Sequence, residues 1–140
     1  MTNKYSIVDE LSSKHFEQLH ELYKQMWWSK DRTREEIVTL LKNCIIVAAI
    51  DNQSHDLVGF ARVLTDELRY AFIFDVMTQE NLRGKGLGKL IIQSALSHTK
   101  LQRVKYFELT CEPELTSYYE KFGFSKNYIN VTPMRKCSTN

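Results

Sequence analysis

Hydrophobic positions in the first part of the chain have the spacing of one strand and two helices. Residues 5–9 predict a short strand, and an amphipathic helix follows, because five apolar residues recur at helical spacing. These are Phe16, Leu19, Leu22, Tyr23 and Met26. Thr33 and Glu36 have the spacing of a capping box, so we expect a second helix to begin there and to stop near Asn43.

The middle of the chain predicts three consecutive antiparallel strands. Residues 44–50 form a continuous run rich in β-branched residues, as expected of a strand that is buried on both faces. The polar segment 51–54 has turn chemistry and leads to a second strand at 57–65. Another polar turn precedes a third strand at 70–78, so we expect an antiparallel meander.

The pattern changes at the polar segment 79–86, which contains glycine. Apolar residues from Leu87 to about Lys100 then form a helical stripe, so this segment joins a strand to a helix. Residues 106–111 alternate between apolar and polar, which predicts a fifth strand. The order strand, helix, strand implies a parallel pair at this point.

The end of the chain completes a mixed fold. A short helix at 116–121 is expected to end at a left-handed Gly123, and residues 124–131 are expected to supply one or two closing strands. The order β-α-α-β-β-β-α-β-α-β indicates an α+β fold, with a mixed, mostly antiparallel central sheet flanked by about four helices. A length of 140 residues fits one domain over residues 1–140.

Composition excludes several classes of function. The 19 basic and 17 acidic residues are interspersed and give a net charge of only +2, so no nucleic-acid surface is expected. The three cysteines lack a C-x-x-C pair and the four histidines lack metal-ligand spacing, so neither a disulfide framework nor a metal site is expected. The N-terminus lacks the apolar stretch of a secretory signal, and the run 44–50 is too short to span a bilayer. We therefore expect a cytoplasmic protein without membrane contact.

The segment from residue 83 to residue 89 predicts a site for a phosphate-bearing anion. The first backbone N–H groups of the following helix have no intrahelical partners, and the helix dipole favours negative charge there. Three glycines allow the backbone to approach a ligand closely, and three basic side chains add positive charge. These six residues are Gly84, Gly86, Gly88, Arg83, Lys85 and Lys89.

Two common phosphate-binding loops do not match this segment. A P-loop requires a Ser or Thr after its lysine, whereas Leu90 follows Lys89. A dinucleotide fingerprint requires a third glycine at position 89, where this chain has Lys89. It also lies early in a βαβ unit, whereas this loop follows antiparallel strands. Nucleoside triphosphates and NAD are therefore disfavoured as ligands.

The segment instead resembles the signature of the GNAT superfamily of acetyl-CoA-dependent N-acetyltransferases. That signature places Arg or Gln, then Gly, then Gly or Ala at the spacing of Arg83, Gly86 and Gly88, and the order of elements is also the family's. The resemblance implies that loop amides bind the coenzyme pyrophosphate and that the preceding strand pairs with the pantetheine arm. It also implies that this strand splays from the next one to admit the thioester. The implied coenzyme contacts are Val76, Met77, Thr78, Arg83, Gly84, Lys85, Gly86, Leu87, Gly88 and Lys89.

A late tyrosine matches the second signature of the same family. Tyr119 lies just before Glu120-Lys121-Phe122-Gly123-Phe124, where family members have the tyrosine that protonates the departing coenzyme thiolate. The resemblance implies this role for Tyr119. The alternative is that Tyr118 and Tyr119 only pack a short helix.

The acceptor site and the general base are less clearly marked. In relatives the first two helices and the central strands frame the acceptor pocket, which here offers Trp27, Trp28, Arg62 and Asp75. Aromatic walls with one carboxylate suit a cationic amine, whereas Arg62 suits an acceptor carboxylate. The alternative for the two tryptophans is that they close the first helix over the core. Asp75, Glu108 and Glu112 are each candidates for the base.

Two functions follow from this resemblance. The first is transfer of the acetyl group from acetyl-CoA to a primary amine of a small molecule or peptide, by direct attack on the thioester. The second is a non-catalytic acetyl-CoA-binding or regulatory module with the same fold. The sequence leaves open whether the protein is a monomer or a homodimer.

Overall fold

A mixed sheet organises the first part of the chain. The computed structural model describes residues 3–128 and 130–138. The chain divides into two units, Met1–Thr110 and Cys111–Asn140. The described strands stand in the order β1-β2-β3-β4-β5; β1 to β4 are antiparallel, and β4 and β5 are parallel. Their bounds are β1 (Tyr5–Val8), β2 (Ile45–Asp51), β3 (Leu57–Thr65), β4 (Tyr70–Thr78) and β5 (Tyr106–Glu108). The expected antiparallel meander is confirmed.

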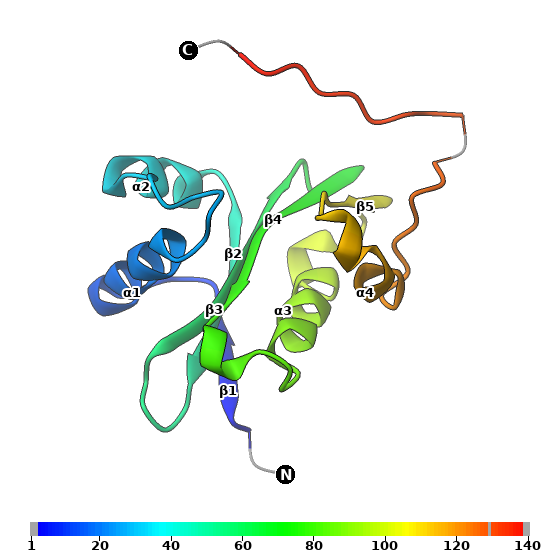
Figure 1. Ribbon diagram of the computed structural model, residues 1–140. Coiled ribbons are helices and arrows are strands. Elements are labelled where there is room, and N and C mark those ends of the chain that lie inside the picture. The colour runs from blue at the N-terminus through cyan, green and yellow to red at the C-terminus, as the bar shows by residue number, and fades with distance from the viewer. Residues whose placement is uncertain (1–2, 129, 139–140) are drawn as a thin grey trace. The chain divides into compact units, whose positions relative to one another are not determined.

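Helices cover both faces of this sheet. Figure 1 shows α1 (Ser13–Lys24) and α2 (Arg34–Lys42) on one face and α3 (Leu87–Leu96) on the other. The second unit contains α4 (Thr116–Glu120). Three short 3-10 helices complete the described secondary structure: Glu80–Leu82, Thr99–Leu101 and Pro113–Leu115. None of the described helices is long and apolar enough to cross a membrane.

Local capping fixes where α2 begins. Thr33 Oγ1 accepts a hydrogen bond from the Glu36 N–H, and the Glu36 carboxylate accepts one from the Thr33 N–H at 2.8 Å. The capping box is therefore confirmed, and it satisfies two amides that the helix itself leaves unpaired. Because the charged carboxylate of Glu36 accepts the hydrogen bond from the Thr33 N–H, the pKa of Glu36 is lowered.

One hydrophobic cluster lies between α1, α2 and the sheet. Leu19, Leu22 and Tyr23 of α1 are fully buried together with Ile37 of α2. They pack with sheet residues that include Phe60, and the Tyr23 and Phe60 rings meet edge to face with centroids 6.0 Å apart. This packing fixes the end of α1, where the loop to α2 starts.

Two predicted elements extend less far than the sequence pattern suggested. Helix α3 ends at Leu96 instead of about Lys100, because the backbone bonding tightens there: the Ser97 N–H still donates to the Gln93 carbonyl at 3.0 Å, whereas the His98 N–H donates to the Ala95 carbonyl at 3.3 Å and a 3-10 turn follows. Strand β5 ends at Glu108 instead of Cys111, since its pairing with β4 stops there. Alternation in a sequence does not supply the partner that a strand requires.

The predicted closing strand at 124–131 is wrong for the residues that the structure describes there, a range that leaves out Ile129. Their backbone groups form local turns instead of a ladder: the Asn127 N–H donates to Ser125 Oγ, and the Tyr128 N–H donates to the Lys126 carbonyl. Asn130 has a left-handed φ of 66°, which interrupts an extended strand. That residues 1–140 form one domain stays a prediction.

Close packing of α3 on β3 depends on Gly59. A Cβ at this position would lie 2.5 Å from Ile91 Cδ1 on α3 and 3.3 Å from the Met77 carbonyl oxygen. We expect Gly59→Ala to lower the free energy of unfolding by about 1–3 kcal/mol through overpacking. Ile91→Val alone should cost about 0.5–1.5 kcal/mol.

The two substitutions together should cost less than their sum, because Ile91→Val removes the atom that the new methyl group meets. Urea unfolding of the wild type, both single variants and the double variant measures this coupling. Strictly additive costs would contradict the proposed contact.

Candidate active site

The junction between β4 and α3 exposes backbone amides at a helix start. The Gln79 N–H donates to the Val58 carbonyl at 2.9 Å, which ties the junction to β3. Gly86, the residue before α3, has a left-handed φ of 85° and no side chain to cap the helix. The Leu90 N–H donates to the Gly86 carbonyl at 3.1 Å, so helix geometry leaves the amides of residues 87–89 without intrahelical acceptors.

The same junction has the conformation and charge that an anion requires. Gly84 also has a positive φ, and a Cβ at either glycine would meet nothing within 4 Å, so the backbone is open to a ligand. The side chains of Arg83, Lys85 and Lys89 are exposed, and the first turn of α3 contains no acidic residue. The buried Leu87 anchors the helix start to the core. The helix dipole and these charges favour an anion here.

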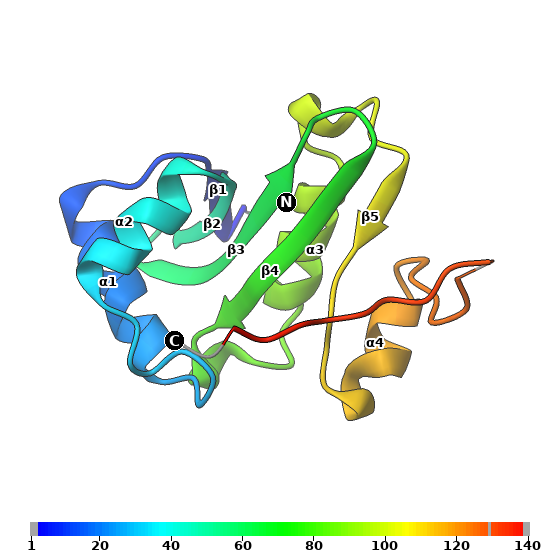
Figure 2. The same cartoon turned by 90° about the horizontal axis from the view of Figure 1, so that it is seen from above.

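One edge of β4 is open along the half that leads to this junction. Pairing with β5 is confined to Tyr70–Phe72, opposite Tyr106–Glu108. In the part of the chain that the structure describes, residues 73–78 of β4 have no partner on that side. Figure 2 shows β5 as a short arrow beside only the first part of β4. Val76, Met77 and Thr78 therefore lie on a strand edge that can pair with an extended ligand.

A bulge in β4 brings Asp75 and Arg62 together. Asp75 and Val76 lie opposite the single Ala61, and Asp75 has a φ of 56°. Asp75 Oδ2 accepts hydrogen bonds from Arg62 Nε at 2.6 Å, from Arg32 Nη1 at 2.8 Å and from the Tyr23 hydroxyl at 2.8 Å. Burial and the nearby Asp75 charge raise the pKa of Tyr23, so its hydroxyl remains a donor.

This arrangement bears on the candidate bases. Oδ2 of Asp75 already accepts three hydrogen bonds, so a proton from an amine would have to displace one of these donors or go to Oδ1. Glu108 is half-buried on β5, and Glu112 is exposed in the second unit. The identity of the base stays open. Among the described residues, no group of His, Cys, Asp or Glu is placed to hold a metal ion.

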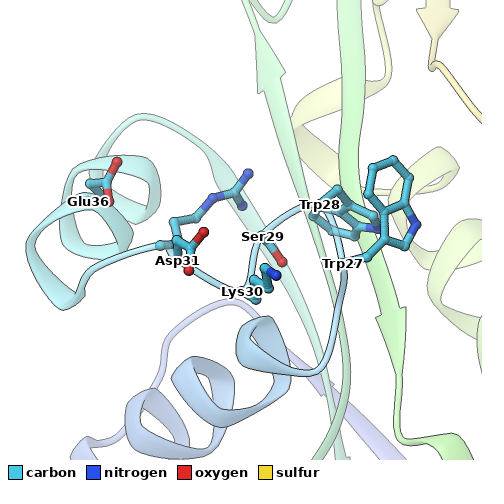
Figure 3. A pocket seen from close by; sticks show the side chains of 7 residues that line it. Trp27, Trp28, Ser29, Lys30, Asp31 and Glu36 are labelled. Atoms are coloured by element: carbon cyan, nitrogen blue, oxygen red, sulfur yellow. The ribbon is translucent and has the colours of Figure 1, made fainter.

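The two tryptophans lie on the α1–α2 loop, residues 25–33, and line a surface pocket. Trp27 is 74% exposed and Trp28 37% exposed, so the alternative that the pair closes α1 over the core is wrong. Figure 3 shows the two indole rings near each other and Glu36 at the opposite end of the pocket. The residues that line it are Trp27, Trp28, Ser29, Lys30, Asp31, Arg32 and Glu36.

Sequence reasoning missed Tyr23 and Arg32 as partners of this site. They lie 52 and 43 positions from Asp75, and no motif connects those positions. A weak signal existed for Arg32, which stands between the tryptophan pair and the capping box. Arg32 is thus a second cation beside Asp75, in addition to Arg62.

Tyr119 belongs to α4 in the second unit. Its ring meets Tyr118 edge to face at a centroid distance of 5.1 Å and Phe124 at 6.3 Å, and the residue is buried. Burial raises the pKa of Tyr119 to about 12, so the phenol is protonated at neutral pH. The Gly123 N–H donates to the Glu120 carbonyl at 3.0 Å, and Gly123 has a φ of 93°, which confirms the left-handed residue after this helix.

Comparison with known proteins identifies the family of this chain. The profile described as Acetyltransferase (GNAT) family matches residues 6–124. The chain belongs to this acetyltransferase family. The uncharacterized N-acetyltransferase ycf52 of Pyropia yezoensis is 30% identical to it over 119 residues, which are 84% of this chain and 68% of that protein.

Another acetyltransferase and a solved structure agree with this assignment. Histone acetyltransferase TAP1 of Glycine max is 30% identical over 127 residues, 83% of this chain but only 54% of that protein. A crystal structure of a GNAT-family protein from Xanthomonas campestris pv. campestris has a TM-score of 0.84 at 19% identity. It covers 99% of this chain and 96% of its own. The fold is thus the GNAT fold, and the protein is an N-acetyltransferase of a family that uses acetyl-CoA.

Proposed function

We propose that this N-acetyltransferase transfers the acetyl group of acetyl-CoA to a primary amine, which attacks the thioester directly. The observation that supports this most is the β4–α3 junction, where two left-handed glycines and three unpaired helix amides adjoin an open strand edge. A pyrophosphate and an extended amide-bearing arm are the two ligand shapes that these features fit. Acetyl-CoA contains both.

The coenzyme contacts in this proposal follow from that fit. Amides of residues 84–89 bind the pyrophosphate, and Arg83, Lys85 and Lys89 neutralise its charge. The pantetheine arm pairs with the open edge of β4 at Val76, Met77 and Thr78. An N–H group on that edge polarises the thioester carbonyl as an oxyanion donor does.

The bound coenzyme supplies an activated acyl group as a thioester. A bond forms from the amine nitrogen to the acetyl carbon, the carbon–sulfur bond breaks, and the nitrogen loses a proton to a base or to water. Tyr119 donates the proton that the departing thiolate requires. Its pKa of about 12 keeps the phenol protonated at neutral pH, so it can donate to sulfur as negative charge develops there. Because a thiol has a pKa of about 8.5, complete transfer is uphill, and the phenolate regains its proton from solvent.

The acceptor, in this proposal, binds at the pocket of the α1–α2 loop. Trp27 and Trp28 offer aromatic faces, and Asp31 and Glu36 offer carboxylates, which together suit an amine that arrives as a cation. GNAT acetyltransferases act on small-molecule or protein amines, and both classes fit an open surface pocket.

Release of free coenzyme thiol from acetyl-CoA tests the proposed reaction. The purified protein is assayed with spermidine, 2-phenylethylamine, lysine and a lysine-containing peptide, and without an amine as the control. We expect release that depends on an added amine, with formation of the N-acetyl product. Binding of acetyl-CoA without amine-dependent release for any acceptor would contradict transfer.

Gly86 allows a matched test of the coenzyme site. Asn and Asp have the same shape and both tolerate a positive φ, and a side chain at position 86 has open space. We expect Gly86→Asp to weaken acetyl-CoA binding about ten- to a hundredfold relative to Gly86→Asn, because only Asp repels the pyrophosphate. Isothermal titration calorimetry measures both dissociation constants. Equal values for the two variants would place the pyrophosphate elsewhere.

Tyr119→Phe separates proton donation from packing. The substitution keeps the ring contacts with Tyr118 and Phe124, so the fold should persist. We expect kcat to fall about a hundredfold while the dissociation constant of acetyl-CoA stays unchanged. Tyr118→Phe is the control and should retain kcat.

The pKa of Tyr119 also predicts the shape of the pH profile. With a raised pKa the donor form is complete below pH 10 and is lost only as the pH rises through about 12. Wild-type kcat should therefore show no fall between pH 8 and about pH 10 from this group. A fall in that range that Tyr119→Phe abolishes would show an ordinary tyrosine pKa instead.

A further inference from the structure

We propose that Asp75 is a positioning residue that holds the α1–α2 loop against β4 through Arg32. The inference rests on the proposed function in one respect, namely that this loop binds the acceptor. Asp75 then determines how well the acceptor binds without contacting it. Its side chain is only 7% exposed, which agrees with a role through other residues.

One carboxylate oxygen joins three separate elements of the fold. Oδ2 of Asp75 on β4 accepts hydrogen bonds from Tyr23 at the end of α1, from Arg32 on the α1–α2 loop and from Arg62 on β3. The loop is held near α1 as well, because the buried Ser29 hydroxyl donates to the Tyr23 carbonyl at 2.8 Å. The ion pair of Arg32 adds a link from the loop to the sheet.

Arg32 also contacts Trp28, so the ion pair with Asp75 affects the position of that ring. Its guanidinium carbon lies 4.7 Å from the centroid of the Tyr23 ring and 5.7 Å from that of Trp28. A cation over an aromatic face is attracted to it, so a fixed guanidinium favours a fixed indole. The position of Trp28 in the pocket therefore depends on the pairing of Arg32 with Asp75.

The two arginines are held unequally, and this decides what would move without Asp75. The Arg62 guanidinium also lies over the Phe74 ring at 4.6 Å, and its Nη1 donates to Cys44 Sγ at 3.4 Å. Without Asp75, Arg62 thus keeps a hydrogen bond and a ring contact in the sheet, whereas Arg32 keeps its ring contacts with Tyr23 and Trp28. Arg32 is the more exposed cation of the two, at 22% against 12%. Without the carboxylate the two cations repel, and Arg32 with its loop moves outward.

Asn is the substitution that isolates the charge at position 75. The bulge holds Asp75 at a φ of 56°, a conformation that Asn and Asp tolerate better than other residues with a side chain. Asp75→Asn therefore keeps the backbone and the size of the side chain while it removes the counter-ion. Arg32→Gln is the second variant, and it leaves Asp75 paired with Arg62 and Tyr23, so the sheet keeps its network.

Arg34→Gln is the matched control. Arg34 is two positions from Arg32 and pairs with Glu17 on the surface, where both side chains are half-exposed. It lines neither the pocket nor the network around Asp75. Arg34→Gln thus makes the same change from arginine to glutamine at a residue that does not connect Asp75 with the α1–α2 loop.

The chain has a built-in reporter, because its two tryptophans both lie on this loop. In a Trp27→Phe background, quenching by acrylamide measures the accessibility of Trp28 alone. We expect the quenching constant to rise about twofold in Asp75→Asn and in Arg32→Gln, since Trp28 is now 37% exposed, and to stay unchanged in Arg34→Gln.

Kinetics in the protein with both tryptophans connect the loop to the reaction. With 2-phenylethylamine as the probe amine, we expect its KM to rise about tenfold in Asp75→Asn and Arg32→Gln. The dissociation constant of acetyl-CoA should not change, because the coenzyme contacts lie at the β4–α3 junction. Arg34→Gln should match the wild type in both quantities.

The two measurements fail in different ways. An unchanged quenching constant in both variants overturns the link between Asp75 and the loop, whatever the activity. Increased quenching with an unchanged KM overturns the role of the loop in acceptor binding. A wild type without turnover of the probe amine overturns the proposed function for that amine class, while quenching still decides whether Asp75 holds the loop.

Discussion

Strand β4 is paired unequally on its two sides, and the rest of the site depends on this. The pairing of β4 with β3 runs from Ala71, opposite Thr65, to Thr78, opposite Gly59. The pairing of β4 with β5 includes only the first three residues of β4. The paired side gives β4 a fixed place in the core, with Ala71, Ile73 and Met77 buried. The unpaired side leaves backbone donors and acceptors that require a partner or water. A strand edge next to a helix start is therefore available to a ligand without any movement of the sheet.

The bulge in β4 adds a second consequence of the same pairing. Two residues of β4 stand opposite Ala61, so the strand keeps its register with β3 on both sides of the bulge while Asp75 turns toward α1. A regular strand would place successive side chains on alternate faces. The bulge thus lets one strand place Met77 in the cluster that packs with α1 and α2 and also present the Asp75 carboxylate to Tyr23 and two arginines.

Local patterns predicted much of the fold from the sequence. The bounds of β3 and β4 agree with the turns that flank them, and the capping box placed the start of α2, because each depends on residues a few positions apart. The glycine loop was also predictable, since left-handed backbone at Gly84 and Gly86 is a property of the residue type. The end of β5 was not predictable, because a strand ends where its partner ends. The end of α3 was not predictable either, because the apolar pattern does not mark the change to tighter backbone bonding at His98.

The contacts of the site were the least predictable part. Asp75 and Arg62 were both expected in the acceptor region, yet nothing in their spacing showed that they pair or that Arg32 and Tyr23 complete the network. The exposure of Trp27 could not be inferred either, since a tryptophan after an amphipathic helix is equally compatible with the core. Such contacts depend on tertiary distances that only the assembled sheet determines.

Stability alone is a poor reason for the network around Asp75. A buried ion pair gains Coulomb energy but loses hydration, and well-packed apolar side chains often stabilise a protein as much or more. The positive φ of Asp75 adds a backbone cost of about 1–3 kcal/mol. A fold selected for stability at this position would use a regular strand with an apolar residue. Strain and buried charge at one residue, under a loop that lines a pocket, are more economically explained by the need to hold that loop in one place.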